Sequence, residues 1–455
     1  MDVTALQRVI DGTVVASGAD DYETVRRTML WNQLCPERRP DAIVRVANQD
    51  DVVAAVRFAG EHRVQVAIRS GGHSWCGSPL RDGGLLLDLG RLNALSIDAA
   101  ARTAAVQPAV TGRDLSRPLA AQGLAFPVGH CSTVAVGGYL LSGGFGWNAG
   151  VWGPACLNVQ AIDVVTAGGE IVRASESENA DLLWAARGAG PAFFGVVTCF
   201  HLAVHPSPRA VMTSTYVYPL VVLPQLAAWL PALAAALPRE VELTVLLTGT
   251  PPRGTASADG EWLCLLTATA FVDDERTAVA ALAALEQSPV LSAALAVERN
   301  RPTPFEALFD MLDGHFPMRH RYIADTVWSD DPPARVLTSV QELLARAPSP
   351  LSRLLCVMPP AAPAAGAATD SALSMSAGLF VACYAIWDDP AADGVNRAWH
   401  RDAIAALEPF AVGHYIGESD LVTTPARLPR CFAPANWQRL QALRRQYDPN
   451  GVFHS

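Results

Sequence analysis

The chain has 455 residues, half of them hydrophobic, and a formal net charge of −10. A chain of this length is too long for one compact core, so we expect two or three domains. The acidic balance, without a cluster of Lys and Arg, argues against a nucleic-acid-binding protein.

Membrane and secretion signals are not evident in the sequence. No stretch approaches the ~20 consecutive apolar residues of a membrane helix, and the N-terminal residues contain no signal-peptide core. The nine cysteines are scattered and include no CxxC pair, which is not the pattern of a disulfide framework. We therefore expect a cytoplasmic protein with no membrane partner and with mostly buried thiols.

The segment up to about residue 207 alternates short strands and helices. We expect strands at 42–46, 64–70, 84–89 and, around a turn, within 93–108. Helical spacing predicts helices at 50–62 and 112–124, the second ending near Gly123. The Gly-Gly pair inside 162–175 predicts a β-hairpin.

After residue 207 the expected elements become longer. Helices are predicted at 223–237, 274–287 and 334–347, and strands at 240–248, 261–272 and 378–387. This pattern favours a mostly antiparallel sheet with helices on one side. The Ala-rich segment 361–372 is expected to be a surface loop.

Two glycine-rich loops each follow an apolar run: RSGGHS at 69–74 and GGYLLSGGFG at 137–146. Glycine lets the backbone approach a ligand, and consecutive N–H groups can bind an anion, so a cofactor with a diphosphate is the natural occupant. Gly144, Gly146 and Ala149 also match a dinucleotide fingerprint. We reject that match because the acid that should end the second strand would be Asp163, which begins its strand.

His73 follows two glycines, and Cys131 lies in a second glycine-bordered loop. One interpretation is ordinary: a histidine bonded to backbone and a small buried thiol. A zinc site of His73, Cys76, His130 and Cys131 is another, although the spacing matches no usual ligand pattern. The third interpretation is that His73 and Cys131 are covalent tethers.

Five motifs, in this order, resemble the berberine bridge enzyme family: RSGGHS, GGLLLDLGRLN, GHCSTVAVGGYLLSGGFGW, LLWAARGAGPAFFGVVT and YDPNGVF. This family belongs to the vanillyl-alcohol oxidase superfamily, whose FAD domain has the p-cresol methylhydroxylase fold. The resemblance implies an α+β protein with an N-terminal segment (1–36) and a two-lobed FAD-binding domain (37–207). A substrate domain (208–410) would carry a mostly antiparallel sheet covered by helices, and a C-terminal segment (411–455) would return to the FAD domain.

In this family the histidine of RSGGH bonds the 8α carbon of the flavin, and in bicovalent members a cysteine bonds C6. The resemblance therefore implies FAD held covalently by His73 and Cys131, and no metal. The residues implied to line the diphosphate are Arg69, Ser70, Gly71, Gly72 and Ser74. Those implied to let the chain pass close to the cofactor are Gly137, Gly138, Gly143 and Gly144, and the adenine or ribose side would contact Gly195 and Val197.

The family often uses a tyrosine base in a Y-x-N-Y segment near the C-terminus. Here the matching run is HYIGESD: Tyr415 matches the first tyrosine, Gly417 replaces the asparagine, and Glu418 stands where the second tyrosine usually lies. Glu418 is therefore our candidate base, which requires that burial raise its pKa. The alternative is a solvated loop acid.

A second polar segment, HFPMRHRYIADTVW at 315–328, resembles the stretch that lines the substrate in the family. Strand alternation would direct His320 and Tyr322 to one side and Arg319 and Arg321 to the other. One of these sets could meet an acidic or hydroxylated substrate. The alternative is an exposed edge strand with ordinary ion pairs.

Val134 holds the position, three residues after the cysteine, that controls oxygen access in the family, and valine there accompanies oxidases. The resemblance implies an oxidase that transfers a hydride from a hydroxyl, amine or phenolic substrate to FAD and reduces oxygen to hydrogen peroxide. A dehydrogenase, a natural-product oxidative cyclase and a non-catalytic flavin or ligand-binding protein are alternatives. The sequence indicates neither the substrate nor the oligomeric state.

Overall fold

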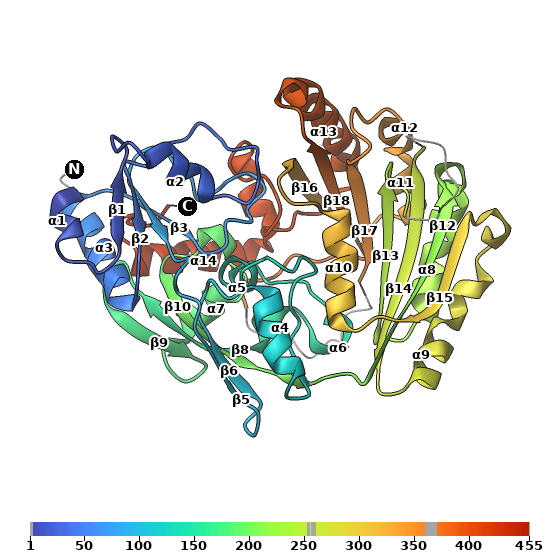
Figure 1. Ribbon diagram of the computed structural model, residues 1–455, viewed down its shortest axis with the longest axis horizontal. Coiled ribbons are helices and arrows are strands. Elements are labelled where there is room, and N and C mark those ends of the chain that lie inside the picture. Colours follow the sequence, from blue (N-terminus) through green and yellow to red (C-terminus); the bar gives the residue numbers. More distant parts are fainter. Residues whose placement is uncertain (1–2, 253–254, 256–260, 360–370, 455) are drawn as a thin grey trace.

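The computed structural model describes residues 3–252, 255, 261–359 and 371–454. Figure 1 shows two lobes side by side, with both chain termini in the lobe built mainly from the N-terminal half. All of the predicted Ala-rich loop except its last two residues lies outside the described residues.

The first lobe contains a small sheet in the order β1-β2-β4-β3. Its strands are β1 (Thr13–Ala16), β2 (Ala42–Arg45), β3 (Val66–Arg69) and β4 (Leu85–Asp88). Strand β4 pairs in parallel with β2 and β3, and its near-continuous apolar run suits a strand covered on both faces. Helix α3 (Gln49–His62) connects β2 to β3 and begins at Asn48, whose side chain accepts a hydrogen bond from the N–H of Asp51.

A second, antiparallel sheet in the same lobe has the order β5-β6-β10-β8-β9. Its strands are β5 (Leu95–Asp98), β6 (Thr103–Val106), β8 (Val159–Val165), β9 (Ile171–Ser175) and β10 (Val196–Ala203), and β7 (Leu124–Ala125) pairs separately with β11 (His205–Pro206). The other helices of this lobe are α1 (Val3–Gln7), α2 (Tyr22–Thr28), α4 (Gly112–Ala120), α5 (Val136–Leu141), α6 (Ala149–Trp152) and α7 (Ala180–Ala186).

The second lobe is built on a seven-stranded antiparallel sheet in the order β15-β12-β14-β13-β17-β18-β16. Its strands are β12 (Ala210–Pro219), β13 (Val241–Thr248), β14 (Leu263–Val272), β15 (Ala296–Pro302), β16 (Arg321–Ser329), β17 (Arg353–Met358) and β18 (Leu379–Trp387). One face packs on the helices α8 (Leu223–Ala236), α9 (Glu275–Leu282), α11 (Pro333–Thr338), α12 (Gln341–Leu344) and α13 (Asp393–Leu407). The other face is turned toward the first lobe, and α10 (Phe305–His315) lies between the two (Figure 1).

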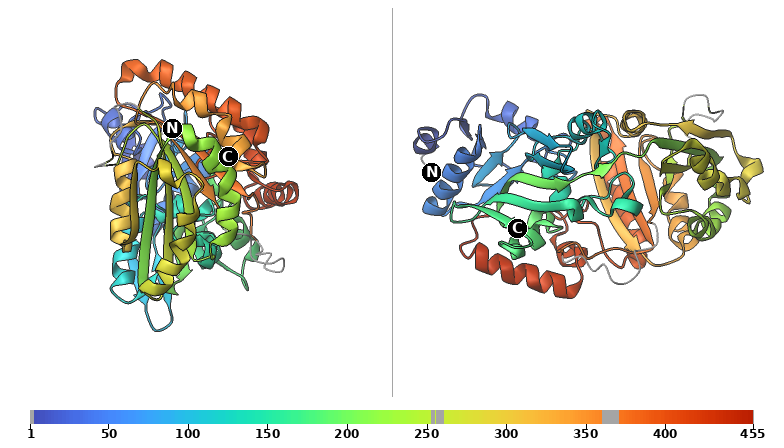
Figure 2. Two further views of the ribbon diagram at one scale, coloured as in Figure 1. Left: turned by 90° about the vertical axis from the view of Figure 1, so that its right-hand side faces the viewer. Right: turned by 90° about the horizontal axis from the view of Figure 1, so that it is seen from below.

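The C-terminal segment returns to the first lobe. Helix α14 (Pro434–Tyr447), red in Figure 2, contributes Leu440 and Leu443 to the core of that lobe. Phe453 then forms a β-bridge with Val66 beside the outer strand β3. The chain thus closes on the sheet from which the RSGGHS loop departs.

The predicted elements are confirmed in type and differ mainly at their ends. The helix expected at 334–347 is divided into α11 and α12, and the one expected at 274–287 ends as a 3₁₀ turn over Ala283–Gln287. Strand β12 was not predicted. On the face of β12 that is turned to the other lobe, threonines occupy alternate positions. The hydrophobic pattern by which a strand is recognised in a sequence is therefore weak here.

Asn32 is a buried polar link between the lobes. Its amide donates hydrogen bonds to the carbonyls of Trp75 (2.8 Å) and Tyr322 (2.9 Å), and its carbonyl oxygen accepts one from the Tyr322 N–H (2.9 Å). The first partner belongs to the loop after β3 and the second to β16. This side chain therefore joins the first lobe to the second.

We expect Asn32→Ala to lower the melting temperature by about 2–3 °C, because it leaves buried partners unsatisfied at a cost of about 2–3 kcal/mol in a chain of this size. The exposed Asn93→Ala serves as the matched control and should not change it. Differential scanning calorimetry makes the comparison, and equal melting temperatures for the two variants would contradict this role of Asn32.

Candidate active site

A cavity of about 1010 Å³ lies between the two lobes. The glycine-rich loops of the first lobe form one wall, and the face of the seven-stranded sheet opposite α8 and α13 forms the other. Residues 415–422 complete the lining. The volume lies at the upper end of the range for small-molecule sites, which is typical of a site that takes both a cofactor and a substrate.

The RSGGHS loop presents backbone donors to this cavity. In the described part of the chain, none of the five N–H groups of residues 70–74 donates to another protein group. The guanidinium of Arg69 bonds instead to Asp88 (2.9 Å) and to the carbonyls of Met29 (3.2 Å) and Gly71 (3.4 Å). Arg69 therefore fixes the loop, and the loop supplies the free donors that a diphosphate requires.

The RSGGHS loop touches the second glycine-rich segment directly, at the point where that segment begins as helix α5 rather than as the predicted loop. A Cβ added to Gly71 would lie 2.6 Å from the Cβ of Ala135, and one added to Gly137 would lie 2.8 Å from the hydroxyl oxygen of Ser70. Glycine is needed at both positions because no side chain fits between the two segments. Ser70, Gly72, Ser74 and Gly138 also line the cavity, as do Gly195 and Val197 at the start of β10.

Gly143 and Gly144 do not line the cavity, which differs from the prediction that they let the chain pass close to a cofactor. Their φ angles are +104° and +74°, and an added Cβ would meet Leu373 and Tyr139, respectively, at 2.9 and 2.8 Å. These glycines serve a turn and the packing behind it. Gly146, two residues further on, does line the cavity.

His73 lies in this cavity with its ring stacked on Trp31 at a centroid distance of 4.9 Å. Its Nε2 is 3.0 Å from the hydroxyl of Thr133, a residue of the loop that carries Cys131. Burial, with a smaller effect of the Arg69 charge, lowers the pKa of His73 to about 4. The imidazole is therefore neutral at pH 7.

Cys131 lines the same cavity, as does Val134. Burial, with smaller contributions from the nearby acids Glu418 and Asp313, raises the pKa of the Cys131 thiol to about 12. The thiol is therefore protonated at neutral pH. Because His73 contacts Thr133, the structure brings the two predicted tethers to neighbouring loops of one cavity.

Glu418 faces the cavity from the loop that follows α13. The surrounding protein raises the pKa of its carboxyl, and a hydrogen bond from Tyr384 and the charge of His130 offset this only in part. The Tyr384 hydroxyl donates to Glu418 Oε2 at 2.5 Å. The alternative of a freely solvated loop acid does not describe this environment.

Tyr415 lines the cavity beside Glu418, and its hydroxyl accepts a hydrogen bond from the Gly144 N–H at 3.3 Å. Its ring packs edge-on against Phe145 at 5.2 Å. Burial raises its pKa, so the phenol stays protonated. Tyr415 thus holds the glycine turn against the loop of the candidate base.

His320 and Tyr322 do not line the cavity, contrary to the predicted contact with substrate. The Tyr322 hydroxyl donates to the carbonyl of Pro317 at 2.5 Å, and its ring packs on Trp31 and Trp75. His320 lies 3.0 Å from Asp388. We assign neither residue a catalytic role, because both side chains are taken up by structural contacts.

The alternative given for this segment holds in part, because the strand lies at a sheet edge and carries an ion pair but is mostly buried rather than exposed. β16 is the edge strand of the seven-stranded sheet. Arg321 forms an ion pair with Asp393 at 2.6 Å, and Arg319 precedes the strand.

A polar pair across the cavity was not predicted. His130 Nε2 lies 2.7 Å from Glu242 Oε1, and both residues line the cavity. Burial acts to lower the pKa of His130, but the charge and hydrogen bond of Glu242 raise it above its usual value overall. The alternation of Glu242 and Thr244 along the predicted strand was the available signal that β13 has a polar side.

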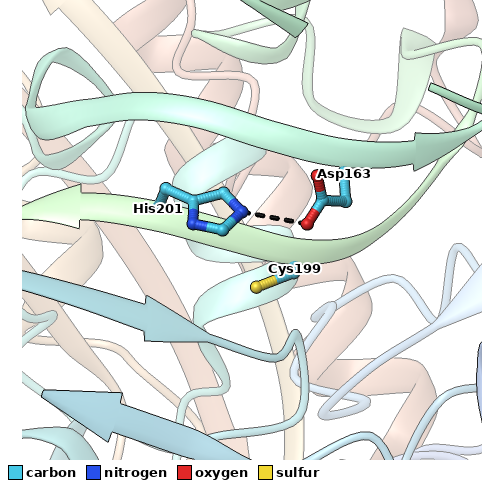
Figure 3. Close-up of side chains that lie close together, drawn as sticks. All are labelled: Asp163, Cys199 and His201. Atoms are coloured by element: carbon cyan, nitrogen blue, oxygen red, sulfur yellow. Dashed lines mark hydrogen bonds and ion pairs between the residues drawn. The ribbon is translucent and has the colours of Figure 1, made fainter. Parts of the chain in front are cut away.

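Asp163, Cys199 and His201 are the described side chains grouped closely enough to hold a metal, and they lie on β8 and β10 outside the cavity (Figure 3). Arg173 donates to both carboxylate oxygens of Asp163, at 2.8 and 3.0 Å, and lies 3.0 Å from His201 Nε2. The positively charged guanidinium of Arg173 therefore occupies the position beside Asp163 and His201 that a metal ion would take. The zinc alternative for His73, Cys76, His130 and Cys131 finds no such grouping in the described chain.

Comparison with known proteins agrees with this geometry. Residues 40–175 match the model of an FAD binding domain. The FAD-linked oxidoreductase nodO of Hypoxylon pulicicidum is 31% identical over 432 residues, which cover 95% of this chain and 94% of that protein. The chain belongs to the family of FAD-linked oxidoreductases. It is an enzyme, and its cofactor is FAD.

Solved structures share the whole fold. The 6-hydroxy-D-nicotine oxidase of Arthrobacter nicotinovorans has a TM-score of 0.82 and 24% identity, over 98% of this chain and 97% of that one. The berberine bridge enzyme of Eschscholzia californica has a TM-score of 0.82 and 20% identity, over 100% of this chain and 97% of that one.

A third neighbour, the grass pollen allergen Phl p 4, has a TM-score of 0.83 at 19% identity, over 100% of this chain and 98% of that one. It is described with glucose dehydrogenase activity, and its isoleucine-to-valine variant as a glucose oxidase.

None of the described helices combines the length and apolar character needed to traverse a bilayer.

The raised pKa of His130 gives the His130–Glu242 pair a pH-dependent contribution to stability. The contribution is fully present below the unfolded-state pKa of histidine, near 6.5, and is lost as pH rises through the higher folded-state value. We expect Glu242→Gln to lower the melting temperature by about 1 °C at pH 5.5 and to have little effect at pH 9. The exposed Glu342→Gln is the control, and a Glu242→Gln effect that is the same at both pH values would contradict the assignment.

Proposed function

We propose that the protein is an oxidase of a hydroxyl, amine or phenolic substrate, with FAD attached through His73 and Cys131 and with Glu418 as the base. The observation that carries this proposal is one cavity that contains both candidate tethers, five unpaired N–H groups and a carboxyl of raised pKa. FAD, when bound, supplies the acceptor for the substrate's hydride and passes the electrons to oxygen, giving hydrogen peroxide.

The two tether residues start from different protonation states. The neutral imidazole of His73 has a free nitrogen lone pair at pH 7, because its pKa is about 4. The Cys131 thiol must first lose a proton, since the thiolate is the nucleophile. Glu418 and Asp313 lie close enough to affect its pKa, and Glu418 is the nearby group that we expect to take this proton.

Glu418 is suited to take a proton from the substrate. Its raised pKa moves it toward the operating pH, where a general base is most effective. The phenol of Tyr384, whose pKa is raised far above the ordinary value by burial, stays protonated and donates to Oε2. Oε1 is then free to receive the proton, and Tyr384 fixes the direction in which it points.

Two observations favour an oxidase over a dehydrogenase. Val134 lines the cavity beside Cys131, at the position that controls oxygen access in the family. In the neighbour Phl p 4, a change from isoleucine to valine accompanies a change from a described dehydrogenase to a described oxidase. An enzyme with another electron acceptor would use the same substrate half-reaction and release no peroxide, whereas an oxidative cyclase would differ in its organic product.

The nine cysteines are all free, which supports a reducing, cytoplasmic location.

We expect Glu418→Gln to slow anaerobic reduction of the bound flavin by substrate about 10²–10⁴-fold, the usual contribution of a general base. Flavin content should not change, because the attachment through His73 does not depend on Glu418. Stopped-flow absorbance measures the rate, with the exposed Glu178→Gln as control. A Glu418→Gln rate within twofold of the unaltered enzyme would exclude Glu418 as the base.

Val134→Ile should slow reoxidation of the reduced flavin by oxygen about tenfold or more, a barrier change of about 1.4 kcal/mol, while reduction by substrate stays the same. The added methyl group narrows the path to the flavin. The same substitution at the exposed Val151 is the control. Unchanged oxygen reactivity in Val134→Ile would remove the argument for an oxidase.

A further inference from the structure

The seven-stranded sheet has two unlike faces. On β13, Leu243, Val245 and Leu247 pack against the helices, whereas Glu242, Thr244 and Leu246 line the cavity. The register of the neighbouring strands continues these cavity positions into rows across the sheet.

One of these rows is apolar on five adjacent strands. From the outer edge inward its members, all lining the cavity, are Ala296 (β15), Val217 (β12), Leu265 (β14), Leu246 (β13) and Leu355 (β17). We call this set the apolar row. On the next strand, β18, it meets Ala382, two positions before Tyr384.

The apolar row leads from the sheet edge to the candidate base. Neighbouring strands lie about 4.8 Å apart, so the path from β15 to β18 is about 24 Å long. Its inner end lies beside Tyr384, whose hydroxyl bonds to Glu418. At its outer end Glu298 and Arg301 of β15, with side chains 56% and 59% exposed, line the cavity where it meets solvent.

The apolar row is buried although it lines the cavity, with Val217, Leu246 and Leu265 at 3%, 7% and 3% exposed. Its leucines and valine cluster with each other and with Leu263 rather than with a helix. Met311 and Leu312 of α10 line the cavity as well and add to its apolar surface.

Polar groups lie in the neighbouring rows rather than in the apolar row itself. The adjacent row contains Glu298, Thr215, Thr267 and Thr244, and the hydroxyls of Thr215 and Thr267 lie 3.3 Å apart. A sugar lying on the apolar row would leave the hydroxyls on that side without partners, which is costly. A hydrocarbon surface would lose nothing here.

We propose that the apolar row binds the hydrocarbon body of an elongated substrate whose hydroxyl or amine lies at the Tyr384–Glu418 end. The position of the reacting group rests on the proposed function, whereas the binding of the hydrocarbon body rests on the sheet alone. The substrate class is thus a long, mostly apolar alcohol or amine rather than a sugar.

The test uses straight-chain primary alcohols of 4, 6, 8 and 10 carbons as probes. Isothermal titration calorimetry of the FAD-loaded protein, under anaerobic conditions, gives each dissociation constant. We expect the constant to fall about two- to fourfold for each added methylene, the upper value corresponding to complete burial of each CH₂. A constant that does not depend on chain length, or tighter binding of cellobiose than of decanol, would overturn the proposal.

Variants assign the effect to the apolar row. The double variant Leu246→Thr/Leu265→Thr introduces β-branched side chains that strands favour and should bind decanol at least tenfold more weakly. Thr244→Val, a matched change in the opposite direction on β13, should bind it equally well or more tightly. Weaker binding by both variants, or an unchanged constant in the double variant, would contradict the role of the row. If the double variant does not fold, the Thr244→Val result decides alone, and weaker decanol binding by it overturns the proposal.

Calorimetry separates this inference from the proposed function. A protein that binds longer alcohols more tightly but reduces its flavin with none of them would contradict the proposed reaction and leave the apolar row intact. A protein that oxidises butanol and decanol with equal efficiency and equal affinity would contradict the row and leave the reaction intact.

Discussion

The close contact between the two glycine-rich segments is the constraint on which the site depends. There is no room for a Cβ at Gly71 or Gly137, so the segments lie directly on each other. This contact places the RSGGHS loop next to the loop of residues 131–134, with His73 against Thr133. It also leaves the N–H groups of residues 70–74 unpaired and turned to one cavity. A bulky side chain at either glycine would separate the anion-binding loop from the second candidate tether.

The second lobe contributes polar side chains to the cavity beside these two glycine-rich segments. Its sheet uses one face for a helix-covered core and leaves the other face for the cavity. Tyr384 extends from the cavity face to Glu418, and Glu242 reaches across to His130 of the first lobe. The proposed reacting groups are therefore held by both lobes, and the closure of the chain through α14 onto the first lobe keeps them together. Substrate recognition and cofactor binding have separate structural origins in this arrangement.

Local motifs made most of the cofactor side predictable. His73, Cys131 and the glycines of RSGGHS lie in short contiguous runs, and Glu418 was found because it stands in the place of an expected tyrosine. The substrate side was harder to predict. Alternation pairs His320 with Tyr322 but does not reveal that Tyr322 packs inward on Trp31. A glycine run does not reveal that Gly143 faces Leu373 rather than a ligand. His130 and Glu242 are 112 residues apart, and every residue of β18 is buried, so nothing in the sequence singles out Tyr384.

The most direct test of the account is the intact mass of the protein in denaturing acid, for the native chain and for His73→Ala, Cys131→Ala and the double variant. The account predicts one added FAD on the native chain and on each single variant, and none on the double variant. Loss of all added mass in His73→Ala together with no loss in Cys131→Ala would show one tether and contradict the role of Cys131. A native protein that contains FAD in solution but releases all of it on denaturation would contradict covalent attachment altogether.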